Sequence, residues 1–323
     1  MLSTVSSQAS KEVGYDPFAR GPFAVSVRTI EALDKTRDRL FPCEIWSPES
    51  AEGSHPLILY SHHSSGHRRA ATFLCDHLAS HGYVVAALDH SEVIAEDLKG
   101  KEGETSEQLG ARVDAWIANR VPDIRFLLDC LLGDPDAHVD PDRVGAVGHS
   151  FGGWTALAAP EVEARIQAVV ALAPAGSSRP KSGVIPAKLT FRWGRDVPTL
   201  FLIAENDVPL PLDGMYEIFE RTPSAKQMVI LRRADHYHFL DSVEEVHETV
   251  RATTFPQFLA WMTAAMRPIS ELCSGEQAHL LVRGLTLSHM DAVLKEHPEA
   301  RRFLRGDIEA ELAARGVDVL VHK

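Results

Sequence analysis

Ser150 lies in the segment AVGHSFGG, residues 146–153, between two glycines that fit the pattern G-x-S-x-G. The apolar run RVGAVGH before the serine predicts a strand, and SFGGWTALAA predicts the start of a helix. Small residues at 148 and 152 permit a sharp strand-to-helix turn, which would expose the serine hydroxyl. The pattern therefore predicts a nucleophile, and a small polar residue in a glycine-rich turn is the alternative.

A serine hydroxyl is a weak nucleophile, so it needs a general base, and the base needs an acidic partner. Asp207 follows the predicted strand PTLFLIAEN, and His236 follows the next one, KQMVILRR. Glu205 is the rival acid and His238 the rival base. We expect Asp207 because it stands in the turn, and His236 because it is the first histidine after its strand. Ser150, Asp207 and His236 together predict acyl transfer.

Acyl transfer also needs an oxyanion hole, in which two backbone N–H groups bind the negative oxygen of the tetrahedral intermediate. Phe151, the residue after the serine, is the first expected donor. The segment SHHSSGH at 61–67 follows an earlier strand, and there we expect Ser64 to supply the second N–H, with His63 beside it. The candidates for lining the substrate site are His63, His149 and His238.

Short apolar runs alternate with helix patterns from residue 56 to 233, as in PLILYSH, YVVAALDH and IQAVVALAP. Strands that are buried on both faces have such continuous apolar runs, so the alternation predicts a doubly wound, mostly parallel α/β sheet with flanking helices. Two further strands precede it within residues 23–48. In an open parallel sheet, ligands bind at the carboxyl ends of the strands, which is where the three expected catalytic residues fall.

The chain divides into an N-terminal extension over 1–22, a catalytic domain over 23–267 and a helical C-terminal extension over 268–323 that packs on the domain. Within the catalytic domain, residues 91–106 are polar and predict an exposed loop. A helix pattern over 107–133 contains a proline at position 122, which predicts a break or a kink.

The C-terminal extension carries apolar residues at helical spacing, which predict a face that packs on the domain. A contact between two copies of the chain in a homodimer is the alternative. These residues include Leu280, Leu281, Leu285 and Leu287.

The chain is 45% hydrophobic and 24% charged, which is typical of a globular protein. Its 45 acidic and 33 basic residues give a net charge of −12, so nucleic acid and anionic membranes would be repelled. No apolar run reaches the roughly 18 residues of a membrane span, and the N-terminus lacks the pattern of a secretory signal. With four widely spaced cysteines, these features predict a cytoplasmic protein with reduced thiols that acts on a small molecule.

Sixteen histidines raise the question of a metal site. Four of them follow two neighbouring strands: His62, His63, His67 and His90. No H-E-x-x-H motif or paired cysteine spacing is present in the sequence, so we expect neither a metal nor another cofactor. His62 and His90 are expected to bind the surrounding loops. Asp89 and His90 are expected to support the loop that carries Ser64, with substrate contact as the alternative.

Five segments resemble one family: LILYSHHSSG, LASHGYVVAALDH, VDPDRVGAVGHSFGG, IAENDVPLP and RRADHYHF. They are similar to α/β-hydrolases of the dienelactone-hydrolase-like group, near the bacterial polyester hydrolases and the platelet-activating-factor acetylhydrolases. The resemblance covers about residues 40–240 and implies the α/β-hydrolase fold and a serine esterase. In the acetylhydrolases the acid follows the strand after the nucleophile helix. In this chain that strand ends in VVALAPAG, which contains no aspartate. The resemblance therefore implies Asp207 as the acid, as in the polyester hydrolases.

Two departures from the family bear on function. Dienelactone hydrolases use a cysteine nucleophile, whereas this chain has Ser150, so that specific activity is not expected. In the oxyanion loop, residues 61–67, family members carry His-Gly, whereas this chain has His62-His63. A side chain therefore stands where glycine leaves space.

The sequence predicts a serine carboxylic ester hydrolase. Amide or peptide cleavage by the same residues is one alternative, and a non-catalytic binding protein of this fold is the other.

Overall fold

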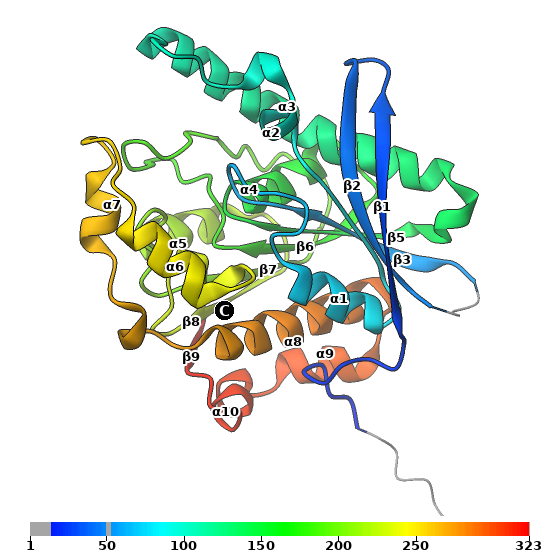
Figure 1. Cartoon of the computed structure of the whole chain (residues 1–323). Coiled ribbons are helices and arrows are strands. Elements are labelled where there is room, and N and C mark those ends of the chain that lie inside the picture. Colours follow the sequence, from blue (N-terminus) through cyan, green and yellow to red (C-terminus); the bar gives the residue numbers. More distant parts are fainter. Residues whose placement is uncertain (1–13, 50–52, 323) are drawn as a thin grey trace, which may run out of the picture.

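The computed structural model describes residues 14–49 and 53–322, which form a nine-stranded sheet in the order β1-β2-β4-β3-β5-β6-β7-β8-β9 (Figure 1). Strands β3 to β8 run parallel to one another, and β1, β2 and β9 are antiparallel to their neighbours. The strands are β1 (Val25–Asp34), β2 (Arg39–Pro48), β3 (His55–Ser61), β4 (Val84–Leu88), β5 (Val139–His149), β6 (Ile166–Leu172), β7 (Thr199–Ala204), β8 (Lys226–Leu231) and β9 (Val319–His322).

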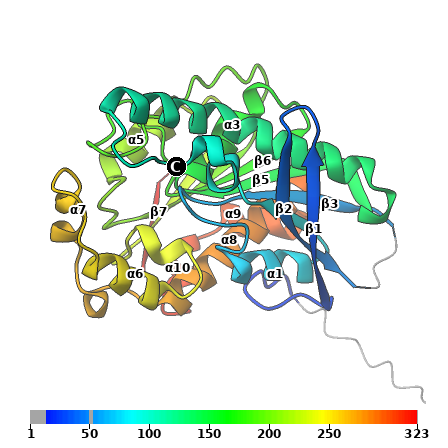
Figure 2. The same cartoon turned by 45° about the horizontal axis from the view of Figure 1, so that its top comes forward.

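Helices cover both faces of the sheet, α1 and α8 on one and α3, α4 and α5 on the other (Figure 2). The predicted doubly wound, mostly parallel fold class is confirmed. None of the helices within the described ranges combines the length and apolar character that a membrane span requires. The helices are α1 (Thr72–Ser80), α2 (Ser91–Ile94), α3 (Ser106–Gly133), α4 (Phe151–Ala158), α5 (Leu212–Arg221), α6 (Val243–Ala252), α7 (Ala260–Ala265), α8 (Gly275–Leu294), α9 (Pro298–Arg305) and α10 (Ile308–Ala313).

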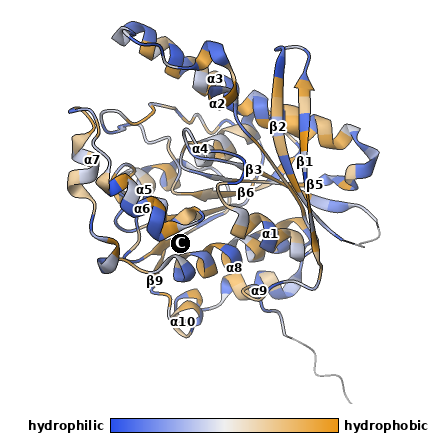
Figure 3. Ribbon diagram, in the orientation of Figure 1, coloured by the Kyte–Doolittle hydropathy of each residue, from blue (hydrophilic) through white to orange (hydrophobic). Residues whose placement is uncertain are grey.

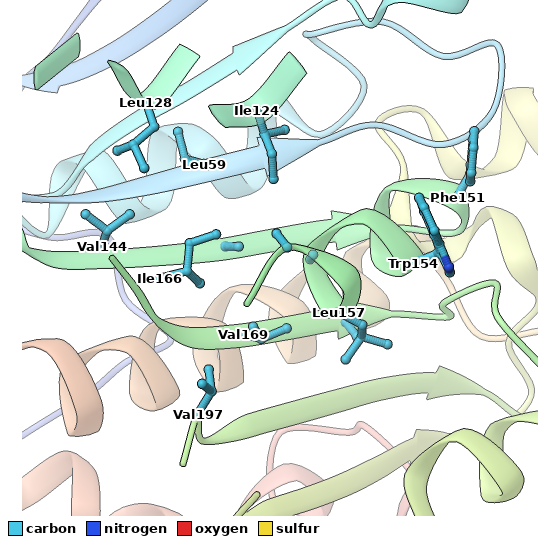
Figure 4. Close-up of a cluster of buried hydrophobic side chains, with 14 of the residues drawn as sticks. Leu59, Ile124, Leu128, Val144, Phe151, Trp154, Leu157, Ile166, Val169 and Val197 are labelled. Atoms are coloured by element: carbon cyan, nitrogen blue, oxygen red, sulfur yellow. The ribbon is translucent and has the colours of Figure 1, made fainter. Parts of the chain in front are cut away.

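The central strands are buried on both faces, which explains their continuous apolar sequences. Every residue of β4 and β7 is buried. Figure 3 shows hydrophobic colour along the central strands, whereas the outer helices alternate between hydrophobic and hydrophilic colour. In the layer between the sheet and α3, Leu59 and Val144 meet Ile124 and Leu128 (Figure 4). Burial of each such side chain stabilises the fold by about 1.5–3 kcal/mol, which holds the strand ends in place.

The helix predicted around Pro122 is not broken, because α3 continues through the proline over 28 residues. A proline removes one backbone hydrogen bond, but the helix buries Ile124, Leu127, Leu128 and Leu131 beyond it. Its start is defined by a capping box between Thr105 and Gln108. Tertiary packing therefore outweighs the local preference of the proline.

The expectation of an exposed loop over 91–106 is wrong for its first part. Ser91 and Glu92 are buried in α2, and Leu98 is buried in a short 3-10 helix. The N–H and hydroxyl of Ser91 both donate to the buried Asp123 on α3, at 2.8 and 2.7 Å. Ser91 and Glu92 therefore face buried partners, whereas Glu96 and Asp97 face water.

The C-terminal residues complete the sheet and one of its helical layers. Helix α8 packs against β5, β6 and β7, and Leu281, Leu285 and Leu287 are fully buried there, with Leu280 packed against the same cluster. The prediction of an almost entirely helical tail misses β9, which pairs antiparallel with β8. A strand of four residues is too short for a clear periodic signal, so its pairing with β8 decides its conformation.

Candidate active site

Ser150 stands in the turn between β5 and α4, with φ 58° and ψ −116°. This left-handed backbone conformation is strained for a residue with a side chain. The flanking glycines are required by close backbone contacts. A Cβ on Gly148 would lie 2.1 Å from the carbonyl oxygen of Gly152, and a Cβ on Gly152 would lie 1.9 Å from that of Ser61. The two glycines therefore allow the start of α4 to pack closely against the end of β3.

The structure joins Ser150, His236 and Asp207 by two hydrogen bonds. The hydroxyl of Ser150 donates to Nε2 of His236 at 2.9 Å, and Nδ1–H of His236 donates to Oδ2 of Asp207 at 2.6 Å. His236 follows β8 and Asp207 follows β7, both at the carboxyl edge of the sheet. The N–H of Leu210 donates to the other oxygen of Asp207 at 2.7 Å and orients this carboxylate.

The environment of His236 favours its charged form. Burial alone would lower the pKa of His236, but the charge of Asp207 and the hydrogen bond to it raise that pKa above its usual value of 6.5. The ring of His149 lies 4.7 Å from that of His236, and burial lowers the pKa of His149 far below its usual value. The neighbouring imidazole thus stays neutral and does not repel a proton on His236.

The two rival residues have other partners. Glu205 accepts the N–H of Arg233 and pairs with Arg232. His238 contacts Asp235 through Nδ1 at 2.8 Å and donates through Nε2 to the carbonyl of Cys273 at 3.0 Å. Neither belongs to the hydrogen-bonded chain that starts at Ser150.

The two expected oxyanion donors have unused amides. Ser64 is the second residue of a turn that the hydrogen bond from Gly66 N–H to His63 C=O closes at 3.1 Å. Phe151 is the first residue of α4. Within the described residues, no hydrogen-bond acceptor pairs with the N–H of Ser64 or Phe151. Both can therefore donate to an added negative oxygen.

His63 is half-buried and lines a cavity of about 470 Å³ between the oxyanion loop and α6. Its ring lies against Gly66, where a Cβ would be 2.7 Å from the imidazole, so Gly66 provides the space for the ring. Burial and then the nearby His236 lower the pKa of His63 to about 3. His149 and His238 are fully buried, so neither lines a surface open to substrate, contrary to expectation.

The loops around His62 and His90 are held as expected from the sequence. The N–H of His90 donates to Nε2 of His62 at 3.1 Å, and the hydroxyl of Ser61 donates to Nε2 of His90 at 2.8 Å. Asp89 accepts from the N–H and guanidinium of Arg68, at 2.7 and 2.6 Å. These contacts tie the end of β4 to the loop that carries Ser64.

Sequence reasoning missed Arg120, which is fully buried on α3. Its guanidinium donates to the carbonyls of His62 and His63 and pairs with Glu92. A lone arginine within a helix pattern is typical of a solvated face, so no sequence signal marked it. It adds a buried cation behind the oxyanion loop.

One group of residues in the described part of the chain has the geometry of metal ligands. His90, Glu92 and Asp123 offer ligand atoms within 4.8 Å of one another. The carboxylates of Glu92 and Asp123 already pair with the guanidinium groups of Arg120 and Arg37. Because these two cations supply the positive charge, the group does not fit an added metal ion.

Comparison with known proteins gives one family match. The model of the Chlorophyllase family matches residues 14–196, over half of the chain. A platelet-activating factor acetylhydrolase of Cavia porcellus is 23% identical over 240 residues, which cover 62% of this chain and 51% of that protein. The chain thus spans about half the length of this acetylhydrolase. Cutinase est1 of Thermobifida alba is 24% identical over 264 residues, which cover 81% of this chain and 78% of the cutinase.

Among solved structures, a ferulic acid esterase from Streptomyces cinnamoneus superposes with a TM-score of 0.68. The match covers 96% of this chain and all of that one, at 20% sequence identity. At this identity the likeness shows a shared fold, and it extends over a larger share of the chain than the family match does.

Proposed function

The chain belongs to the chlorophyllase family and has the α/β-hydrolase fold, and on that premise we propose that it is a serine hydrolase of small carboxylic esters. The observation that carries this proposal is the hydrogen-bonded chain from Ser150 through His236 to Asp207. The serine is half-buried at a strained turn, and a buried carboxylate orients its base. This arrangement suits nucleophilic attack on a carbonyl carbon.

In the acylation step, Nε2 of His236 takes the proton of Ser150 while Oγ attacks the ester carbonyl. The N–H groups of Phe151 and Ser64 stabilise the negative oxygen of the tetrahedral intermediate. Collapse of this intermediate breaks the bond to the alcohol, which leaves with the proton from His236. Ser150 then carries the acyl group as an ester.

In the deacylation step, His236 takes a proton from water, which attacks the acyl-serine. A second tetrahedral intermediate forms in the same oxyanion hole and releases the carboxylic acid. His236 returns the proton to Ser150, so the protein ends in its starting state. Asp207 keeps Nδ1 protonated throughout and stabilises each transient imidazolium.

The named relatives support an ester as the substrate. An acetylhydrolase, a cutinase and a ferulic acid esterase are each named for hydrolysis, and the last for an ester bond. These names give different substrates, so they support a class of bond rather than a particular substrate. We therefore propose the carboxylic ester bond, rather than an amide, as the one that the protein cleaves.

Replacement of Ser150 tests the proposal. Ser150→Ala should lower kcat on p-nitrophenyl acetate by on the order of 10⁴-fold or more, because the nucleophile is lost. A fluorophosphonate probe should label the wild type and the control Ser106→Ala, whose serine is exposed at the start of α3, but not Ser150→Ala. Undiminished turnover in Ser150→Ala would exclude the proposed nucleophile. Faster turnover of anilides than of matched esters would favour an amidase.

We also infer that the protein works in the cytoplasm. Its cysteines are free thiols, and Cys43, Cys75 and Cys273 are buried. Such thiols persist where glutathione keeps them reduced. Cell fractionation with alkylation of native thiols tests this inference, and recovery outside the cytoplasm would contradict it.

A further inference from the structure

The guanidinium of Arg120 binds two backbone carbonyls of the oxyanion loop. Its Nη1 donates to the carbonyl of His62 at 2.6 Å, and its Nη2 donates to the carbonyl of His63 at 3.2 Å. The arginine is fully buried on α3, so water does not compete for these contacts. A charged donor at two successive carbonyls holds both peptide units strongly.

The orientation of these peptides determines where their N–H groups point. In a planar trans peptide, the C=O of one residue and the N–H of the next point in opposite directions. The carbonyl of His63 accepts from Arg120, from Nδ1–H of His62 at 2.7 Å and from the N–H of Gly66 at 3.1 Å. The N–H of Ser64, in the same peptide unit, is therefore directed away from Arg120.

A reversed peptide between His63 and Ser64 would be unfavourable. It would place the N–H of Ser64 against the guanidinium of Arg120, leaving donors facing donors in a buried site. It would also direct the carbonyl oxygen of His63 toward the place where Ser64 N–H should meet the oxyanion. Arg120 therefore selects the orientation in which Ser64 can act as a donor.

Arg120 also contacts the second half of the oxyanion hole. Its guanidinium carbon lies 4.2 Å from the centroid of the Phe151 ring, within the range of a cation–π interaction. Phe151 follows the nucleophile and is itself buried beside Trp154 (Figure 4). The side chain of Arg120 thus contacts both the peptide that presents the Ser64 N–H and the ring of Phe151.

Other buried groups hold the guanidinium in place. Glu92 pairs with Nη2, and the hydroxyl of Ser61 lies 3.4 Å from Nη1. Both partners come from the carboxyl edge of the sheet, Ser61 from the end of β3 and Glu92 from α2 after β4. The arginine is therefore fixed relative to the strands that carry the site.

We infer that Arg120 is a positioning residue that orients the Ser64 N–H donor of the oxyanion hole and packs against the ring of Phe151, which presents the other donor. This inference rests on the proposed esterase function. It predicts that Arg120 stabilises the tetrahedral intermediate without touching the substrate. Loss of Arg120 should therefore lower kcat much more than it changes KM.

The test compares Arg120 with a matched arginine on the same helix. Arg112 also pairs with a carboxylate, Glu104, and lies over an aromatic ring, that of Trp116, at 4.7 Å. Arg112 has no contact with the oxyanion loop, so Arg112→Gln is the control. The test variant is Arg120→Gln combined with Glu92→Gln, which removes both charges of the buried pair and leaves no lone carboxylate.

The measurements are kcat and KM on p-nitrophenyl acetate and the Ki of a trifluoromethyl ketone, whose serine adduct carries an oxyanion. We expect the double variant to lose on the order of 10²-fold in kcat and a similar factor in inhibitor affinity, with KM little changed. Arg120→Lys should recover only part, because an ammonium does not reproduce the two-pronged contact. The control should match the wild type.

A second variant keeps the test decisive if the double variant does not fold. His62→Phe retains an aromatic ring and Arg120 but removes one of the three donors to the His63 carbonyl, together with the acceptor of the His90 N–H, so inhibitor affinity should fall by a smaller factor. Unchanged kcat and Ki in a folded Arg120 variant would overturn the inference, as would equal effects in Arg112→Gln. Activity in Ser150→Ala would instead overturn the proposed function, so the two failures are distinguishable.

Discussion

Nε2 of His236 lies 2.9 Å from Oγ of Ser150, although 86 residues separate them in the chain. The contact exists because β5 and β8 both end at the carboxyl edge of one parallel sheet, with β6 and β7 between them. Asp207 after β7 reaches the same histidine from its other side. The sheet edge therefore assembles the proton-transfer chain from three separate turns.

Removal of the Asp207 carboxylate should change both the rate and its pH dependence. His236 must be neutral to accept a proton, and its raised pKa puts the acid limb of kcat/KM above pH 6.5. In Asp207→Asn the imidazolium loses its carboxylate, so this limb should move to lower pH and kcat should fall on the order of 10⁴-fold. Stopped-flow pH profiles measure both effects. Glu205→Gln is the control, and an equal shift there would contradict the assignment.

The turn at Ser150 should not tolerate a larger residue at its first glycine. Gly148→Ala would bring a Cβ to 2.1 Å from the Gly152 carbonyl, so the turn must open. We expect loss of esterase activity and destabilisation by about 1–3 kcal/mol in urea unfolding. On α3, a Cβ added to Gly110 would meet no atom within 4 Å outside its own stretch of helix. Gly110→Ala should therefore stabilise the protein by about 1 kcal/mol. An active Gly148→Ala would show that the turn can relax.

The side chain of His63 should limit the size of accepted esters. Its ring lines the cavity beside the oxyanion loop, against Gly66 and 5.6 Å from the ring of His149. In His63→Gly this space opens, so kcat/KM for a bulky aryl ester should rise about 10-fold relative to that for an acetate ester. A series of p-nitrophenyl esters measures the ratio. A constant ratio across the series would mean that His63 does not contact substrate.

The buried pair of Asp235 and His238 should make stability depend on pH in the alkaline range. Burial opposes the charge on His238, but hydrogen bonds to Asp235 and to the Cys273 carbonyl raise its pKa to about 10. A raised folded-state pKa stabilises the protein fully below about pH 6.5, the unfolded value, and this stabilisation disappears as the pH rises through about 10.

His238→Gln removes this contribution. We expect the variant to be less stable by about 3–5 kcal/mol at pH 6, because it leaves Asp235 without one of its buried partners. Its deficit relative to the wild type should shrink between pH 7 and 10, as seen in urea unfolding. The exposed His67, changed to Gln, is the control. A deficit that stays constant with pH would show that His238 is neutral in the folded protein.

The sequence by itself determined the strands of the central sheet and the order of Ser150, Asp207 and His236 among them. Strands buried on both faces must be apolar along their whole length, and a turn as tight as that at Ser150 needs Gly148 and Gly152. These requirements are local, so they are visible in short segments. The fold class and the three turns that meet at the sheet edge could be predicted for that reason.

Only the tertiary structure decided which polar residues are buried. Arg120 has the sequence context of a solvated helix face, yet the carbonyls of His62 and His63 and the carboxylate of Glu92 enclose it. The same holds for His238, which the sequence suggested near the substrate and which lies beneath the site with Asp235. A polar side chain is buried only where distant segments provide its partners. Those partners become known only when the chain has folded.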